Sequence, residues 1–167
     1  MCGIVGFNRM DAHLLSEMMS SILYRGPDEE ASYISDDISM GMRRLSIIDL
    51  TKDLYPLTNE TKDVFLFFNG EIYNFRGLRS ELLELGHRFK TSTDGEVIVH
   101  AYEEWGEHCF NMLNGMFAIS LYDKKNALLY LARDRLGIKP LYYHFKNRNF
   151  IYASEIKSIL LCNDVEK

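Results

Sequence analysis

Met1-Cys2-Gly3-Ile4-Val5-Gly6-Phe7 opens the chain and places a thiol directly after the initiating methionine. Aminopeptidases generally remove a first methionine that precedes a residue as small as cysteine, and Cys2 would then carry a free thiol and a free α-amine. The amine titrates near ~8 and the thiol near ~8.5, so the amine can act as base for the thiol close to neutral pH. The apolar residues 3–7 predict a short buried strand. On this stretch alone, Cys2 as an ordinary packing residue of that strand is the commoner interpretation.

The bulk properties indicate one globular domain. A chain of 167 residues buries roughly 70% of its unfolded surface on folding. A net charge of −5 gives no reason to expect nucleic acid or an anionic membrane as a partner. No apolar run is long enough to span a bilayer, and the N-terminus lacks a secretory pattern. The three cysteines form no CxxC pair, which favours a reducing cytoplasm over disulfides or a zinc site.

Apolar periodicity and breaker residues predict a mixture of strands and helices. Strands are expected at residues 3–7, 31–35, 38–43, 46–49, 64–69, 116–122, 127–134, 141–145 and 150–153. Helices are expected after caps at Asp11, Asn74 and Asp94, with a closing helix at residues 154–161. Because the strands are joined by hairpin turns and the helices come in separate blocks, the chain is expected to be α+β with largely antiparallel sheets.

A thiolate that attacks a carbonyl needs hydrogen-bond donors for the oxyanion that develops. Asn69-Gly70-Glu71 follows the apolar strand directly, where a sharp turn could expose the Asn69 amide and the Gly70 backbone N–H. The alternative is a plain hairpin turn, for which Asn-Gly is the strongest short signal. The pattern by itself favours the turn.

Two further charged positions could hold the ends of an amino acid. Arg44, at the end of a strand, could bind a carboxylate through two parallel N–H bonds, although a surface salt bridge is the commoner use of such a residue. Asp94 could cap a helix, or hold an ammonium group if it faces a cleft. The charged loop at residues 133–139 could equally be a solvated turn with local ion pairs.

Seven sequence blocks carry a resemblance to a known family. They are Met1–Gly6, Arg25-Gly26-Pro27-Asp28, Arg44-Leu45-Ser46-Ile47-Ile48-Asp49-Leu50, Asn69-Gly70-Glu71-Ile72-Tyr73-Asn74, Gly115-Met116-Phe117-Ala118, residues 132–143 and Ala153-Ser154-Glu155-Ile156-Lys157. In this order and spacing, the chain resembles the N-terminal glutaminase domain of glutamine-hydrolysing asparagine synthetases. The likeness runs nearly end to end.

The resemblance implies a fold, an activity and a set of roles. The fold is the N-terminal-nucleophile hydrolase sandwich, a four-layer αββα arrangement with two antiparallel sheets, and residues 1–167 form a single glutamine amidotransferase domain from which Met1 is removed. The activity is hydrolysis of glutamine to glutamate and ammonia. Cys2 is implied as the nucleophile, Asn69 and Gly70 as the oxyanion hole, Arg44 as the binder of the α-carboxylate, and Glu71 and Asp94 as binders of the α-ammonium.

The resemblance also limits cofactors and partners. We expect no metal or cofactor in the glutaminase site. Residues 1–167 contain no Ser-Gly-Gly-rich pyrophosphatase loop, so ATP and Mg²⁺ are expected only in a missing synthetase domain or a separate partner that receives the ammonia. A homodimer is left open. The alternative function is a catalytically weak or inactive regulatory or assembly module that keeps the fold.

Four positions depart from the family pattern: Ala31, Met42, Tyr55 and Gly95. The first three are expected to lie away from the residues that contact substrate. Gly95 adjoins Asp94, and the absence of a side chain there predicts a looser helix start and less secure substrate positioning.

Overall fold

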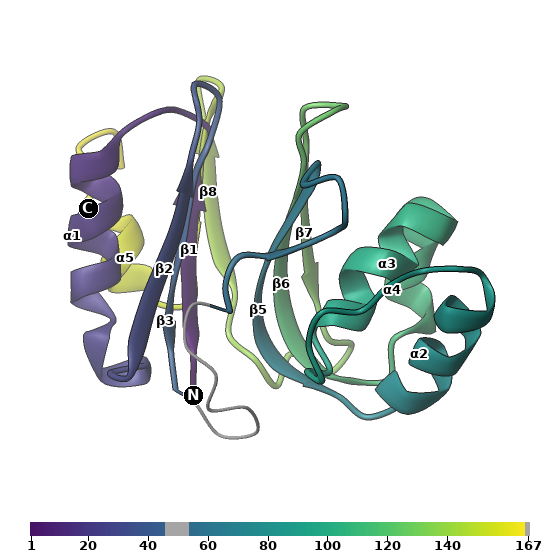
Figure 1. Cartoon of the computed structure of the whole chain (residues 1–167). Helices are drawn as coiled ribbons and strands as arrows, with labels where there is room; N and C mark the ends of the chain where they lie inside the picture. The colour runs from purple at the N-terminus through teal and green to yellow at the C-terminus, as the bar shows by residue number, and fades with distance from the viewer. Residues whose placement is uncertain (46–53, 166–167) are drawn as a thin grey trace.

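The structure is a computed structural model that describes residues 1–45 and 54–165. Its described strands form two antiparallel sheets, packed face to face (Figure 1). One sheet contains, in spatial order, β2 (Glu29–Ile34), β3 (Ser39–Arg44), β1 (Gly3–Phe7), β9 (Asn149–Ala153) and β8 (Tyr142–Lys146). The other contains β4 (Leu57–Thr58), β5 (Val64–Ile72), β6 (Gly115–Asp123) and β7 (Leu128–Arg133). The strand predicted at residues 46–49 lies outside the described residues.

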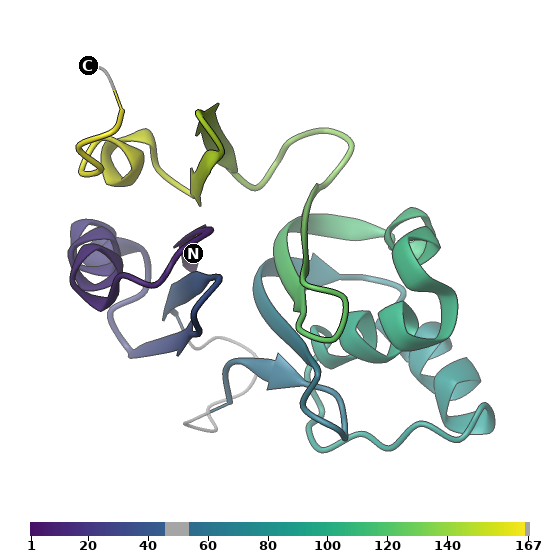
Figure 2. The same ribbon diagram turned by 90° about the horizontal axis from the view of Figure 1, so that it is seen from above.

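Helices cover the outer face of each sheet, which gives four layers in the order α, β, β, α (Figures 1 and 2). On the five-stranded sheet lie α1 (Ala12–Ser21) and α5 (Ile156–Ile159). On the four-stranded sheet lie α2 (Phe75–Glu84), α3 (Glu96–Trp105) and α4 (Cys109–Met112). Short 3₁₀ turns occur at Leu23–Arg25 and Gly106–His108. No helix among the described residues is long and apolar enough to cross a membrane. The α+β sandwich predicted from the sequence is confirmed.

Strand alternation distributes the apolar side chains among three layers of core. In β5, Phe65 and Phe67 pack between the sheets, whereas Leu66 and Phe68 pack against the helices α2 and α3. In β1, Ile4 lies between the sheets, whereas Val5 and Phe7 face α1 and α5. In each of these strands, every second residue therefore faces the layer between the sheets, either the odd-numbered or the even-numbered ones.

The helix starts are as predicted at Asp11 and Asn74 and lie one residue later than predicted at Asp94, but only Asp11 makes a side-chain cap. Asp11 caps α1, since its carboxylate accepts a hydrogen bond from the Leu14 N–H at 2.9 Å. Asn74 precedes α2, but its side chain instead bonds the backbone of Met112 and Asn114. Asp94 does not cap α3, whose N-cap is Gly95. Both side chains are used to join segments that are distant in sequence, which local cap signals cannot reveal.

Three elements differ in extent from the expected ones. The strand β5 continues through Asn69, Gly70 and Glu71 to Ile72, so the Asn-Gly pair forms no turn. The two-residue strand β4 and the helix α4 were not predicted, and the closing helix α5 is shorter than expected. The predicted turn at residues 146–149 is present, with Asn147 and Arg148 both at positive φ.

Candidate active site

Three candidate side chains face the layer between the sheets because of where they stand in the alternating side-chain pattern of three strands. Cys2 lies two residues before Ile4, Arg44 two residues after Met42, and Asn69 two residues after Phe67. Ile4, Met42 and Phe67 all pack between the sheets. Because side chains two residues apart point to the same face of a strand, the three candidates face the inter-sheet layer as well. Parity also distinguishes the two arginines of β3, since Arg43 bonds the Met19 carbonyl of α1 on the outer face.

All six residues proposed from the sequence line a single pocket at the edge of this layer. They are Cys2, Arg44, Asn69, Gly70, Glu71 and Asp94. The other lining residues are Met1, Leu45, Leu54, Tyr55, Phe68, Thr93 and Lys139. These residues come from both sheets and from the segments before β4 and α3, so the pocket exists only in the folded chain.

The Cys2 thiol is held at the start of β1 by backbone contacts. The Leu45 N–H lies 3.4 Å from the Cys2 Sγ, at hydrogen-bond distance for sulfur. The buried Arg25 side chain donates from Nε to the Cys2 carbonyl at 3.0 Å and pairs with Glu155 through Nη1. These contacts fix where the thiol points. Met1 precedes it at the pocket mouth and is 56% exposed, so it is accessible for removal.

Asn69 offers a donor that is not used within the described protein. Its side chain is 2% exposed, and its Nδ2 has no hydrogen-bond partner among the described residues. A buried amide N–H without a partner costs about 1–3 kcal/mol, so such a group calls for an explanation. An oxyanion in the pocket would satisfy it.

The backbone N–H of Gly70 faces the same edge of β5 as that of Ile72. Phe117, which pairs with Gly70, instead exchanges backbone and side-chain hydrogen bonds with Asp134, so its polar groups point away from β5. Gly70 and Phe117 are therefore a non-hydrogen-bonded pair, and the Gly70 N–H points away from β6. At Ile72 this edge faces Asp94, which accepts the Ile72 N–H at 2.7 Å. The Gly70 donor is thus directed toward the pocket side.

Arg44 is buried rather than on the surface. It is 6% exposed, and its Nη1 lies 2.7 Å from the Glu29 Oε2 of the neighbouring strand. Its guanidinium also lies against the Tyr55 ring, 5.8 Å from the ring centre. A guanidinium carries five N–H donors in a planar fork, so Glu29 can fix its orientation while a ligand carboxylate is bound from the pocket.

Two carboxylates also line the pocket. Glu71 is a half-buried residue of β5, and Asp94 lies just before α3. Burial is the main reason that the pKa of Asp94 is raised, and the negative charge of Glu71 adds to it, although the Ile72 N–H opposes the rise. A ligand ammonium between the two carboxylates would relieve this unfavourable electrostatic environment.

Tyr55 and Lys139 are two of the pocket residues that were not proposed as site residues from the sequence. Tyr55 was expected to lie away from substrate, but it lines the pocket; its burial, together with the charges of Cys2 and Asp94, raises the pKa of its hydroxyl. Lys139 is 7% exposed and also lines the pocket. The only sequence signal for Lys139 is its place in a charged loop, which proves to be organised by the buried Asp134 accepting backbone N–H groups, that of Lys139 included.

The expected looseness at Gly95 is wrong. A Cβ at this position would lie 2.9 Å from the Leu57 Cδ1 and 3.0 Å from the Phe68 Cδ1. Glycine therefore lets α3 begin in close contact with β4 and β5, which places Asp94 firmly against the end of β5.

Comparison with known proteins agrees with this geometry. The family profile described as the glutamine amidotransferase domain matches residues 1–167. The chain belongs to this family. Among curated proteins, it is 42% identical to asparagine synthetase [glutamine-hydrolyzing] 2 of Bacillus subtilis over 95% of its own length. It is 41% identical to synthetase 1 of the same organism over 99% of its length, and 39% identical to synthetase 2 of Arabidopsis thaliana over 95%. It spans 22%, 28% and 28% of these relatives, respectively.

Solved structures of amidotransferases share the fold. The glutamine phosphoribosylpyrophosphate amidotransferase of B. subtilis, complexed with ADP and GMP, superposes with a TM-score of 0.75 at 18% identity. A structure described as the allosteric regulatory enzyme of purine biosynthesis gives 0.80 at 19% identity. Each match covers 96% of this chain and 43% of the other. The fold is the N-terminal-nucleophile hydrolase sandwich, as the sequence predicted.

Proposed function

We propose that this amidotransferase domain hydrolyses glutamine to glutamate and ammonia through a glutamyl thioester on Cys2. The observation that carries the proposal is the buried Asn69 Nδ2, which has no partner among the described residues and lines the same pocket as the Cys2 thiol. Oxyanion stabilisation by such preorganised donors is worth several kcal/mol in the transition state. The pocket is also lined by cationic and by anionic side chains, which suits an amino acid.

Each chemical step has a residue to perform it. With Met1 removed, the Cys2 α-amine takes the thiol proton, and the thiolate attacks the side-chain amide carbon of glutamine. Asn69 and Gly70 donate to the resulting oxyanion. As the tetrahedral intermediate collapses, the amine returns the proton to the leaving nitrogen, and ammonia departs. Water then adds to the thioester, glutamate is released, and the thiol is regenerated.

Substrate selection would follow from the positive and negative side chains that line the pocket. Arg44 would bind the α-carboxylate, while Glu71 and Asp94 would hold the α-ammonium. The step needs no metal or cofactor in this pocket, since nucleophile, base and oxyanion donors all come from the chain. Because Cys109 and Cys162 are buried and free, with Cys2 free in the pocket, a reducing cytoplasm suits the protein.

We further propose that the ammonia is used to make asparagine. The relatives that support this carry the name asparagine synthetase, and this chain matches only a part of each. ATP and Mg²⁺ would belong to a synthetase domain or subunit that receives the ammonia.

The test uses the chain with Cys2 as its first residue, produced by cleaving an N-terminal extension. Glutamate release from glutamine is measured, and Cys2→Ala is expected to abolish it. An electrophilic glutamine analogue should label Cys2 once per chain, and glutamine should protect it, while the buried Cys109 and Cys162 serve as internal controls. Retained hydrolysis in Cys2→Ala would overturn the mechanism. A folded Cys2-first chain that stays inactive even with a synthetase subunit added would indicate the regulatory module instead.

A further inference from the structure

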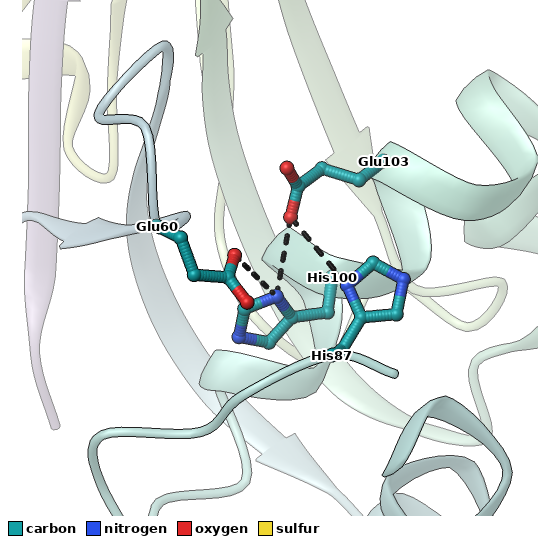
Figure 3. Close-up of side chains that lie close together, drawn as sticks. All are labelled: Glu60, His87, His100 and Glu103. Carbon is teal, nitrogen blue, oxygen red and sulfur yellow. Dashed lines mark hydrogen bonds and ion pairs between the residues drawn. The ribbon is translucent and has the colours of Figure 1, made fainter. Parts of the chain in front are cut away.

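A second group of side chains with coordinating atoms lies outside the residues that line the glutamine pocket (Figure 3). It lies where the turn after β4 and the connection between α2 and α3 meet the helix α3. We call it the His–Glu cluster; its members are Glu60, His87, His100 and Glu103. We propose that the His–Glu cluster is a structural zinc site.

The distances within the cluster match those of a tetrahedral zinc site. Each residue offers one coordinating atom, and the four atoms lie within 4.8 Å of one another. The His100 Nδ1 is 3.1 Å from the Glu103 Oε2 and 3.5 Å from the Glu60 Oε2. The Glu103 Oε2 is 3.8 Å from the His87 Nδ1. Tetrahedral zinc with bonds of about 2.0–2.1 Å places its ligand atoms about 3.4 Å apart. The cluster therefore needs only small movements to enclose the ion.

The two glutamates are oriented by hydrogen bonds to the carboxylate oxygens that do not face the histidines. The Glu60 Oε1 accepts the Arg88 N–H at 2.9 Å, and the Glu103 Oε1 accepts the Asn59 Nδ2 at 2.8 Å. Asn59 is itself fixed, because its Oδ1 accepts the N–H groups that begin β5. In both glutamates the Oε2 is the atom that faces the histidines. Outer partners of this kind orient the ligands in metal sites.

A carboxylate lies near the far nitrogen of each histidine. The His87 Nε2 lies at hydrogen-bond distance, 3.4 Å, from a Glu104 oxygen. The His100 Nε2 lies 3.7 Å from the Glu96 Oε1 and has no hydrogen-bond partner among the described residues. Backbone N–H groups of residues 90 and 91 hold the Glu96 carboxylate at 2.7 Å. A carboxylate bonded to a ligating histidine is a recurrent outer-shell arrangement around zinc, and His87 has it.

The charge of the cluster also suits a divalent cation. The two carboxylates of the cluster would balance the charge of Zn²⁺ when both imidazoles are neutral. His100 is only 1% exposed, so a cation at its ring would be shielded from solvent.

A zinc ion here would join three segments that are separate in sequence. It would tie the α2–α3 connection and the turn after β4 to α3, one helical turn beyond the start at which Asp94 lines the glutamine pocket. The site is closed by four protein ligands, which is typical of structural rather than catalytic zinc. We therefore expect zinc to raise stability.

The test measures zinc binding by the full chain with its Cys2 thiol alkylated, since that thiol and its amine also bind metals. We expect one zinc per chain by metal analysis, a midpoint of thermal unfolding that zinc raises by several degrees, and a tetrahedral Co²⁺ spectrum without a thiolate band. His87→Gln, at the partly exposed rim, should weaken binding by more than about 100-fold, and Glu104→Gln, in the outer shell, by about 10- to 100-fold.

The matched control is His13→Gln, because His13 pairs with Glu17 on the exposed face of α1, far along the chain from the cluster. It should bind zinc as the wild type does. The unfolding midpoint without zinc shows whether each variant is folded. Absence of stoichiometric binding in the wild type, or unchanged binding in folded His87→Gln, would overturn the proposal and leave a hydrogen-bonded cluster of histidines and glutamates. Neither result depends on glutamine hydrolysis.

Discussion

The Asp94 carboxylate accepts the backbone N–H of Ile72 at 2.7 Å, which joins the start of α3 to the end of β5. The Gly70 N–H points to the same edge of the strand, two residues earlier, because residues of like parity in an antiparallel strand share a hydrogen-bonding edge. One strand edge thus carries both the proposed ammonium site and a proposed oxyanion donor. Two residues of strand, roughly 7 Å, separate these two N–H groups.

Replacing Asp94 by asparagine should separate substrate binding from stability. The Asn Oδ1 can still accept the Ile72 N–H, and the change removes a half-buried charge. We therefore expect KM for glutamine to rise at least about 10-fold, the loss of one charge-assisted bond, while the free energy of unfolding stays equal or increases. Steady-state glutamate release and urea unfolding measure the two quantities. A lower stability with unchanged KM would assign Asp94 a purely structural role.

The same carboxylate should give KM a dependence on pH. Its pKa is raised, mainly by burial, and it must be ionised to bind an ammonium. As pH falls, Asp94 therefore protonates earlier than an ordinary aspartate near ~3.9, and KM should rise from a correspondingly higher pH. The free energy of unfolding should rise as the pH falls, because protonation removes the charge that burial disfavours. The profile of KM against pH in Asp94→Asn should lose this step; an identical step in both proteins would exclude Asp94 as its source.

Asn69→Ala and the isosteric Asn69→Asp test the oxyanion donor. Removing one such donor costs about 10²–10³ in kcat, and aspartate would add a negative charge beside the oxyanion. We expect both variants to lose kcat by at least this factor with little change in KM. Because the Asn69 Nδ2 has no partner among the described residues, Asn69→Ala should remain folded. Near-normal kcat in either variant would place the oxyanion elsewhere.

The sequence predicted the features that depend on local patterns and missed those that depend on contacts between segments distant in sequence. Parity and periodicity predicted the described strands except β4, and sequence blocks pointed to Cys2 and Arg44, which line one pocket in the structure. The Asn-Gly pair was expected to end a strand, but pairing with β6 extends β5 past it. The sequence did not place Tyr55 in the pocket, because it comes from an irregular segment with no period that fixes its direction.

The His–Glu cluster was also not predicted, because no local sequence pattern indicates it. Its members come from the turn after β4, the α2–α3 connection and the helix α3. Only His100 and Glu103 lie on the same helix, and a histidine and a glutamate three positions apart do not by themselves indicate a metal site. The cluster exists because packing brings three segments together, which no local pattern records.

Gly70→Ala should be far more damaging than an alanine at Gly77. A Cβ at Gly70 would lie 2.1 Å from the Met116 carbonyl oxygen and 2.7 Å from the Phe117 Cα. Both are backbone atoms of β6, so relief requires the two strands to separate beside Asn69. We expect a loss of at least about 3 kcal/mol or failure to fold.

Gly77→Ala is the matched control for this steric argument. Gly77 lies within α2, and no described atom outside its own helix lies within 4 Å of the position of its Cβ. Alanine there should raise the free energy of unfolding by about 0.5–1 kcal/mol, because glycine is the poorer helix former. Urea unfolding compares the two variants with the wild type. Equal stability of Gly70→Ala and wild type would mean that β5 and β6 are not in the close contact on which the position of the oxyanion donors depends.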